Sequence, residues 1–322
     1  MATTKEIQHR IKSVSNTKKV TRAMEMVAAV KMRKAIEAVL KTRTYANLSW
    51  LTVLNLSRAN GQKRGDEALH PLLCRRPEIK RVGIILITSN RGLCGGFNTA
   101  IINKAHQSIQ KHQSENVETE FILIGKKGAL VNRYYGYKIA AEFSKQDLIS
   151  QVKEVIPVSQ LVIQDYLSGK YDKIMVAYTD FVSPAKQVPR IKQLLPVDIE
   201  AQDEYLGIVG QDTRVGLDGE FVDKKKEKYL KDEKYQYEYT FEPSPSEVLD
   251  EMIPRLIEVQ LFQALLESNA SEHSARMTAM HQATEAAEDM VKELTLFYNK
   301  ARQAAITAEI AEISAGAEAL EL

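Results

Sequence analysis

The chain has 322 residues, of which 44% are hydrophobic and 27% are charged, a composition typical of an ordered protein. No apolar run reaches the roughly eighteen residues that a membrane-spanning helix needs, and the charged start MATTKEIQHRIKS argues against a secretory signal. Two cysteines, Cys74 and Cys94, are too few for a disulfide framework and favour a reducing compartment.

The two ends of the chain carry opposite charges. Residues 1–45 contain eleven Lys or Arg and three Asp or Glu, a net charge of +8, whereas residues 247–322 contain five and fourteen, a net charge of −9. A basic N-terminal arm alone is typical of binding to nucleic acid or anionic lipid. Because the acidic end offers a partner within the chain, we expect the two ends to pair and expect no nucleic-acid partner.

Residues 1–58 are predicted to form one long helix. From residue 5 to about residue 57 there is no glycine and no proline, and Ala, Met, Lys and Arg are abundant. At about 1.5 Å per residue, such a helix is a rod of roughly 75–80 Å. A single globular domain seldom needs a helix of this length.

Residues 78–197 alternate between strand and helix patterns. Strands are predicted at 81–89, 119–125 and 171–182, with an edge strand at 187–197. Helices are predicted at 97–113, from residue 126, and at 147–166 with a bend at Pro157. This alternation indicates a small, mainly parallel, Rossmann-like α/β domain.

Residues 198–241 differ in composition from the rest of the chain. The pattern indicates a hairpin around Leu217-Asp218-Gly219, followed by a solvated lysine-rich stretch and a tyrosine-rich strand. We therefore treat this stretch as a separate part of the chain.

Residues 244–322 are predicted to form the second long helix. Ser244, Pro245 and Glu247 have the N-cap, first-position and third-position pattern of a helix start, and no glycine follows until after Ser314. Pro254 is expected to kink the first turns. Two long helices of opposite charge at the two ends predict an antiparallel coiled coil, with Ile7, Ile11, Val14, Met24 and Val27 at core spacing.

The glycine-rich stretch 90–98 follows the first predicted strand, where a dinucleotide-binding loop would lie. Its spacing is GxxGG and not GxGxxG, and no GxxxxGK[ST] motif occurs in the chain. We interpret it as a tight turn and expect no cofactor, although a dehydrogenase-like enzyme is an alternative that nucleotide titration would test. Cys94 lacks a nearby histidine base, and the six histidines show no metal-ligand spacing. We expect no catalytic residue and no metal site.

Four stretches closely resemble the γ subunits of F-type ATP synthases, in the right order along nearly the whole chain. They are IKSVSNTKKVTRAMEMVAA (11–29), NRGLCGGFN (90–98), ASEHSARMTAM (270–280) and YNKARQAAIT (298–307). The resemblance implies a non-catalytic central rotor subunit that serves ATP synthesis and hydrogen ion transport. An interaction scaffold built on a coiled coil, without a rotary role, is the alternative, and co-assembly with alpha and beta subunits separates the two.

The resemblance also implies partners and contact residues. The paired terminal helices would turn inside a ring of alpha and beta subunits, and the α/β domain would meet the epsilon subunit and the membrane c-ring, with no insertion into the membrane. Residues implied to contact the ring are Lys18, Lys19, Met24, Arg91, Arg302, Gln303 and Thr307. Residues implied to form the foot on the c-ring or epsilon subunit are Tyr239, Phe241 and Glu242. The implied location is the cytoplasmic face of a bacterial plasma membrane, or a thylakoid if the source is cyanobacterial.

Two features depart from the family pattern. Thr284-Glu285-Ala286-Ala287 stands where the family usually has Thr-Asp-Asn-Ala, so an amide contact made by that Asn is lost. The stretch from about 198 to 232 is longer than in a minimal bacterial relative and contains no cysteine, which excludes thiol switching there. Our hypothesis is that it limits wasteful ATP hydrolysis, and deletion of residues 205–230 without any change in hydrolysis would refute it.

Overall fold

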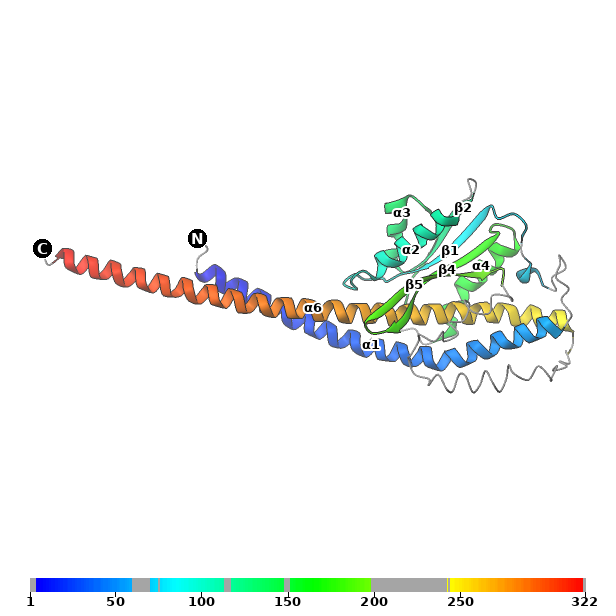
Figure 1. Ribbon diagram of the computed structural model, residues 1–322, viewed down its shortest axis with the longest axis horizontal. Coiled ribbons are helices and arrows are strands. Elements are labelled where there is room, and N and C mark those ends of the chain that lie inside the picture. The colour runs from blue at the N-terminus through cyan, green and yellow to red at the C-terminus, as the bar shows by residue number, and fades with distance from the viewer. Residues whose placement is uncertain are drawn as a thin grey trace. The chain divides into compact units, whose positions relative to one another are not determined.

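Two long helices begin and end the described part of the chain. The computed structural model describes residues 4–59, 70–74, 76–112, 117–147, 151–197, 242 and 244–320. Helix α1 spans Thr4–Ala59 and helix α6 spans Pro245–Leu320 (Figure 1). The chain divides into two compact units, one from residues 1–29 and 276–322 and the other from residues 30–275.

In the first unit, α1 and α6 form an antiparallel coiled coil. The less exposed positions of α1 recur at alternating spacings of three and four, as Ile7, Ile11, Val14, Lys18, Thr21, Glu25 and Ala28 do. Side-chain pairs Lys18–Glu288, Thr21–Thr284 and Glu25–His281 run in opposite directions along the two helices. The predicted coiled coil is therefore confirmed, with polar residues in the middle of its seam.

One residue expected in the seam lies outside it. The side chain of Val27 is 56% exposed, and the small side chain of Ala28 is buried in its place. The reason is the repeat: a spacing of three or four from Glu25 reaches residue 28, not residue 27. Met24 is half-buried beside the seam.

The second unit contains a five-stranded sheet with the order β3-β2-β1-β4-β5 (Figure 1). Pairs β1–β2, β1–β4 and β2–β3 are parallel, and only β4–β5 is antiparallel, which confirms the mainly parallel sheet. In the register, Ile85 of the central strand lies between Ile122 and Val176. The strands are β1 (Arg81–Ile87), β2 (Glu118–Ile124), β3 (Lys138–Phe143), β4 (Lys173–Ser183) and β5 (Lys186–Leu195).

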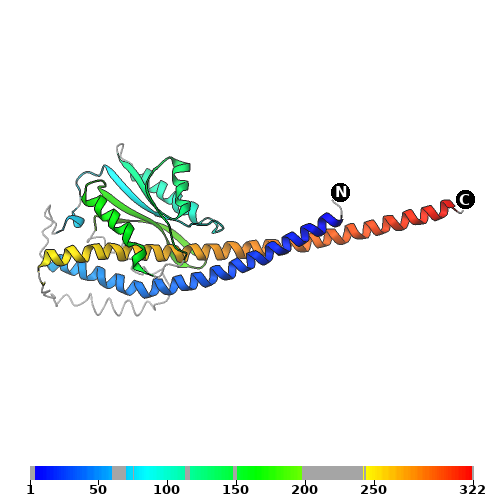
Figure 2. The same cartoon turned by 180° about the vertical axis from the view of Figure 1, so that it is seen from behind.

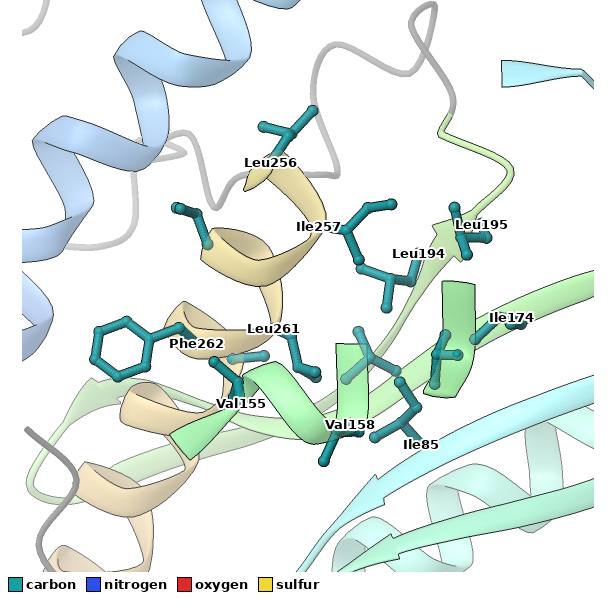
Figure 3. Close-up of a cluster of buried hydrophobic side chains, with 14 of the residues drawn as sticks. Ile85, Val155, Val158, Ile174, Leu194, Leu195, Leu256, Ile257, Leu261 and Phe262 are labelled. Carbon is teal, nitrogen blue, oxygen red and sulfur yellow. The ribbon is translucent and has the colours of Figure 1, made fainter. Parts of the chain in front are cut away.

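Successive side chains of the central strand β1 point to opposite faces of the sheet and belong to two separate hydrophobic cores. Ile84 and Leu86 pack against α2 (Phe97–His112) and α3 (Leu130–Tyr135). Ile85 and Ile87 belong to a larger core with α4 (Ile156–Leu167) and α6. Figure 3 shows Val155, just before α4, close to Leu261 of α6, and Leu194 of β5 close to Ile257 of α6. The sheet with α2, α3 and α4 is called the α/β domain below.

The local structure differs from the expectation at two places. Strand β3 was not foreseen, because most of its side chains are exposed and it lacks an apolar run. The helix expected at 147–166 begins at Ile156, so Pro157 lies in its first turn, where a missing N–H costs nothing, and causes no bend. Three short 3₁₀ helices complete the described elements: Pro71–Leu73, Lys126–Ala129 and Val152–Glu154.

The start of α6 follows the predicted capping pattern. Ser244 Oγ accepts a hydrogen bond from the backbone N–H of Glu247 (3.3 Å) and donates to the Glu247 carboxylate (2.9 Å). The helix continues through Pro254. The hairpin expected around residues 217–219 lies outside the described residues. None of the helices that are described is long and apolar enough to cross a membrane.

Candidate partner-binding surfaces

Basic side chains gather on α1 near the middle of the coiled-coil seam. Ser15, Lys18, Lys19, Arg22 and Glu288 line one shallow hollow. Lys18 Nζ lies 3.0 Å from Glu288 Oε2, and this hydrogen bond, with the charges of Lys18 and Lys292, lowers the pKa of the Glu288 carboxyl. Both side chains remain substantially exposed, so the pair adds little stability. The basic residues outnumber the one acidic residue, and the hollow therefore attracts anionic groups.

Large apolar side chains are exposed on the same stretch of α1. Val20, Met26 and Val27 are each more than half exposed. They lie on the part of α1 that contains Met24, a residue expected to contact the ring. Exposed apolar groups on one element are typical of a surface that a partner covers.

The side chains of α6 are exposed over the last stretch for which they are described, residues 302–314. Every side chain from Arg302 to Ser314 is exposed, including those of Gln303 and Thr307. The Thr307 hydroxyl donates to the Gln303 carbonyl (2.9 Å), which ties two of the expected contact residues together. Ile306, Ile310 and Ile313 are 48%, 58% and 72% exposed at helical spacing, so they form an apolar stripe on one face.

Arg91 lies in the second unit, on the turn that follows β1. Buried Ser89, Cys94 and Asn98 hold this turn: Ser89 donates its N–H to Asn98 Oδ1 (3.0 Å), and Asn98 Nδ2 donates to Cys94 Sγ (3.2 Å). These hydrogen bonds join the two ends of the turn to each other. The arrangement supports the interpretation of a tight turn and presents Arg91 on its exposed rim.

The turn also contains a residue with unusual backbone geometry. Leu93 has φ 62 and a side chain that is 60% exposed, and Gly95 has φ 55. A left-handed conformation at a leucine costs about 1–2 kcal/mol. Cys94 and Phe97, which follow Leu93, are buried, and their burial compensates for that cost and keeps Leu93 beside Arg91 on the surface.

The remaining expected residues concern the foot. Glu242 is exposed, whereas Tyr239 and Phe241 lie outside the described residues. Within the part of the chain that is described, no group of three or more His, Cys, Asp or Glu has the arrangement of a metal site.

Sequence reasoning missed the acidic and polar residues of α6 that meet α1. Glu288 is the ion-pair partner of Lys18, Thr284 contacts Thr21, and His281 contacts Glu25. The signal was present, because the spacing of three and four continues through polar positions such as 18, 21 and 25. A search restricted to apolar residues does not find it.

Comparisons with known proteins agree along the full length. A family model described as ATP synthase matches residues 3–320. The ATP synthase gamma chain of Desulfosudis oleivorans is 40% identical over 328 residues, which cover both chains completely. That of Herpetosiphon aurantiacus is 41% identical over 325 residues, with 99% of each chain covered.

Solved structures share the fold. A chain from the Euglena gracilis mitochondrial ATP synthase has a TM-score of 0.61 at 16% identity and covers 98% of this chain and 94% of its own. A chain from the central stalk and c-ring of the Tetrahymena thermophila enzyme has a TM-score of 0.56 at 21% identity and covers 82% and 99%. From the match over residues 3–320 and the full-length relatives, the chain belongs to the ATP synthase gamma chain family.

Proposed function

We propose that the chain is the central rotor shaft of an F-type ATP synthase and catalyses no reaction itself. It couples rotation of the membrane c-ring to conformational changes at the catalytic beta subunits. Full-length membership of the gamma chain family supports this role. The structural observation that carries it is the end of α6, where a stiff helix exposes every described side chain from Arg302 to Ser314, a stripe of isoleucines included.

The exposed stripe suits a helix that turns inside an apolar sleeve. Apolar contacts are non-directional, so they are exchanged at each angle at little cost, whereas directional hydrogen bonds would hold the shaft at one angle. The helices are long and continuous, which gives the shaft its reach. Because one asymmetric shaft serves several beta subunits, each beta subunit meets a different face at each angle, and this differential contact drives its change of state.

The contact residues implied by the family resemblance are part of the proposal. Arg302, Gln303 and Thr307 are exposed where a polar contact with a beta subunit would hold the shaft at defined angles. The basic hollow of Lys18 and Lys19 suits an acidic segment of a beta subunit. The complete proposed set is Lys18, Lys19, Met24, Arg91, Arg302, Gln303 and Thr307 for the alpha and beta ring, and Tyr239, Phe241 and Glu242 for the c-ring and epsilon subunit.

The division of labour along the chain follows from these roles. Residues 1–58 and 244–322 form the shaft, residues 78–197 form the α/β domain, and residues 198–241 form the insertion and the foot. The subunit is peripheral to an energy-transducing membrane, on the cytoplasmic face of a bacterial plasma membrane or on a thylakoid.

The test is ATP hydrolysis by alpha and beta subunits reconstituted with the chain. The intact chain is expected to join the ring and support sustained turnover. A variant lacking residues 303–322 should still join the ring but turn over more slowly, because it has lost Gln303, Thr307 and the isoleucine stripe. A chain that neither joins the ring nor changes its turnover refutes the rotor assignment and favours the scaffold.

A further inference from the structure

Helix α6 contains a run of polar residues in the interior of the second unit. Asn269, Ser271, Glu272, His273 and Ser274, called the polar belt below, are each at most 5% exposed. Earlier in the same helix, apolar residues such as Leu261 and Leu265 fill the core. Burial of a polar group is costly unless it is hydrogen-bonded, so five examples within the six residues 269–274 of one helix need a reason.

Three members of the polar belt bond to one short segment, residues 145–147, which follows β3. Asn269 Nδ2 and His273 Nε2 both donate to the Asp147 carbonyl, at 3.3 and 3.0 Å. Glu272 Oε2 lies 2.7 Å from Lys145 Nζ, and the two side chains are 7% and 2% exposed. The same segment is tied to the other long helix by Lys31, whose Nζ lies 3.0 Å from Asp147 Oδ2.

The other two members bond to the opposite part of the domain. Ser271 Oγ donates to the Thr179 carbonyl of β4 (3.1 Å), and Ser274 Oγ donates to the Pro184 carbonyl in the β4–β5 turn (2.8 Å). Pro189 is the partner of Thr179 in the β4–β5 register and has no N–H to offer. In both views of the ribbon, the end of this hairpin lies beside α6 (Figures 1 and 2).

The two sets of bonds leave α6 on opposite sides. At about 100° per residue, Asn269, Glu272 and His273 point one way, and Ser271 and Ser274 point roughly the reverse way. The helix is therefore held from two sides by directional bonds. The hydrophobic effect is itself non-directional, whereas a hydrogen bond weakens steeply when its angle changes. These bonds therefore add a directional restraint on the rotation of α6 to the restraint that side-chain packing provides.

We propose that the polar belt fixes the angular setting of α6 within the α/β domain and thereby carries torque from that domain into the shaft. The inference rests on the rotor function proposed above and adds the positioning residues through which the load passes. The Lys145–Glu272 pair fits this role better than a role in stability, since a buried ion pair contributes little net stability but specifies geometry. The polar belt also lies at the last residues of α6 that belong to the second unit.

The experiment compares two variants of the chain in the assembled complex with alpha and beta subunits. In the first, Ser271→Ala and Ser274→Ala remove the bonds to β4 and to the turn. In the second, Leu261→Ala shortens a fully buried apolar side chain of the same helix and serves as the control for lost stability. A bead on the α/β domain reports angular fluctuations while the ring is stalled in one catalytic state, and thermal unfolding of each variant is recorded in parallel.

The first variant is expected to widen the angular fluctuations of the bead, a loss of torsional stiffness. The control should lower the unfolding temperature without widening them. Equal widths in the first variant and the unmodified chain, or equal widening in both variants, would overturn the proposal. If the double variant does not assemble, the single variant Ser274→Ala is judged by the same criterion. Failure of the rotor function is distinguishable by a second recording with ATP and an unstalled ring, in which the bead on the unmodified chain would then not rotate.

Discussion

The hydroxyl oxygens of Thr21 on α1 and Thr284 on α6 lie 2.8 Å apart in the seam of the coiled coil. One turn to each side, Lys18 pairs with Glu288 and Glu25 pairs with His281. Glu25 Oε2 is buried without a described hydrogen-bond partner. Polar residues in a seam reduce stability but specify the register of the two helices. The polar residues in the middle of the seam therefore specify the register of the two helices more than they stabilise the coiled coil.

Removal of one threonine hydroxyl should cost stability, whereas removal of both should not. Thr284→Val leaves the Thr21 hydroxyl without this partner and is expected to lower the free energy of unfolding by about 1 kcal/mol. Thr21→Val together with Thr284→Val replaces both polar groups by apolar ones of similar shape and is expected to be neutral or stabilising. Denaturant unfolding followed by circular dichroism measures both. A double variant less stable than the single one contradicts the account of the seam.

Stability should fall in acid because of Asp172. Its carboxylate is partly desolvated, which raises the pKa, but bonds from the Lys80 and Arg81 N–H groups and from Arg76 (2.9 Å each) outweigh this and lower the pKa below the ordinary 3.8. A carboxyl with a lowered pKa in the folded state stabilises the fold above its unfolded pKa, and this contribution is lost as the pH falls below about 4.

Asp172→Asn tests this contribution. The variant should lose about 1–3 kcal/mol at neutral pH, since it removes a charged acceptor of several hydrogen bonds. Its unfolding free energy should also change less than that of the unmodified chain between pH 5 and pH 2, the range in which an aspartate with a lowered pKa takes up its proton. Parallel curves for the two proteins across this range would show that Asp172 is not the group responsible.

Gly125 should tolerate no side chain. Its φ is +105, and a Cβ there would lie 2.4 Å from the Thr88 carbonyl oxygen, in the turn beside β1. Gly125→Ala is expected to lower the free energy of unfolding by about 2 kcal/mol or more. Gly136 is the matched control: its φ is +73 but nothing lies within 4 Å of its added Cβ, so Gly136→Ala should cost only about 1 kcal/mol. Equal losses would mean that the contact with Thr88 is irrelevant.

The isoleucine stripe should matter for function and not for the stability of the chain. Ile310→Ser with Ile313→Ser changes two exposed side chains, so the isolated chain should keep its unfolding free energy within about 0.5 kcal/mol. In the reconstituted complex, the same variant should slow ATP hydrolysis, because the shaft loses apolar contacts with its sleeve. Glu309→Ala, an exposed change between the stripe positions, is the control. Unchanged turnover in the double variant would argue against a bearing at this end of α6.

Elements with strong local signals were predictable from the sequence. The long stretch without glycine or proline predicted α1, and the pattern of Ser244 and Glu247 predicted the start of α6. The apolar run at 81–89 predicted the buried strand β1. Strand β3 was missed because hydrogen bonds to β2, and not an apolar pattern, hold it in the sheet. The same reasoning explains Val27: the seam follows a fixed spacing through polar positions, and apolarity alone suggested the wrong residue.

The candidate surfaces were only partly predictable. Exposure of Arg302, Gln303 and Thr307 follows from their position on a helix beyond Ala301, its last partly buried residue among those whose side chains are described. The partners of Lys18 and Asp147 did not follow from local sequence, because Glu288 and Lys31 come from positions far along the chain that only the fold brings near. The polar belt had a visible signal, because five of the six residues 269–274 are polar, but its burial depends on the loops and strands that surround α6.

The most direct test of the rotor function is observation of single molecules. The alpha and beta ring is fixed to a surface, a bead is attached to the α/β domain of this chain, and ATP is added. If the chain is the rotor, the bead is expected to rotate continuously in one direction, in discrete steps that depend on ATP. A bead that only fluctuates about a fixed angle, in a complex that hydrolyses ATP, would contradict the rotor function.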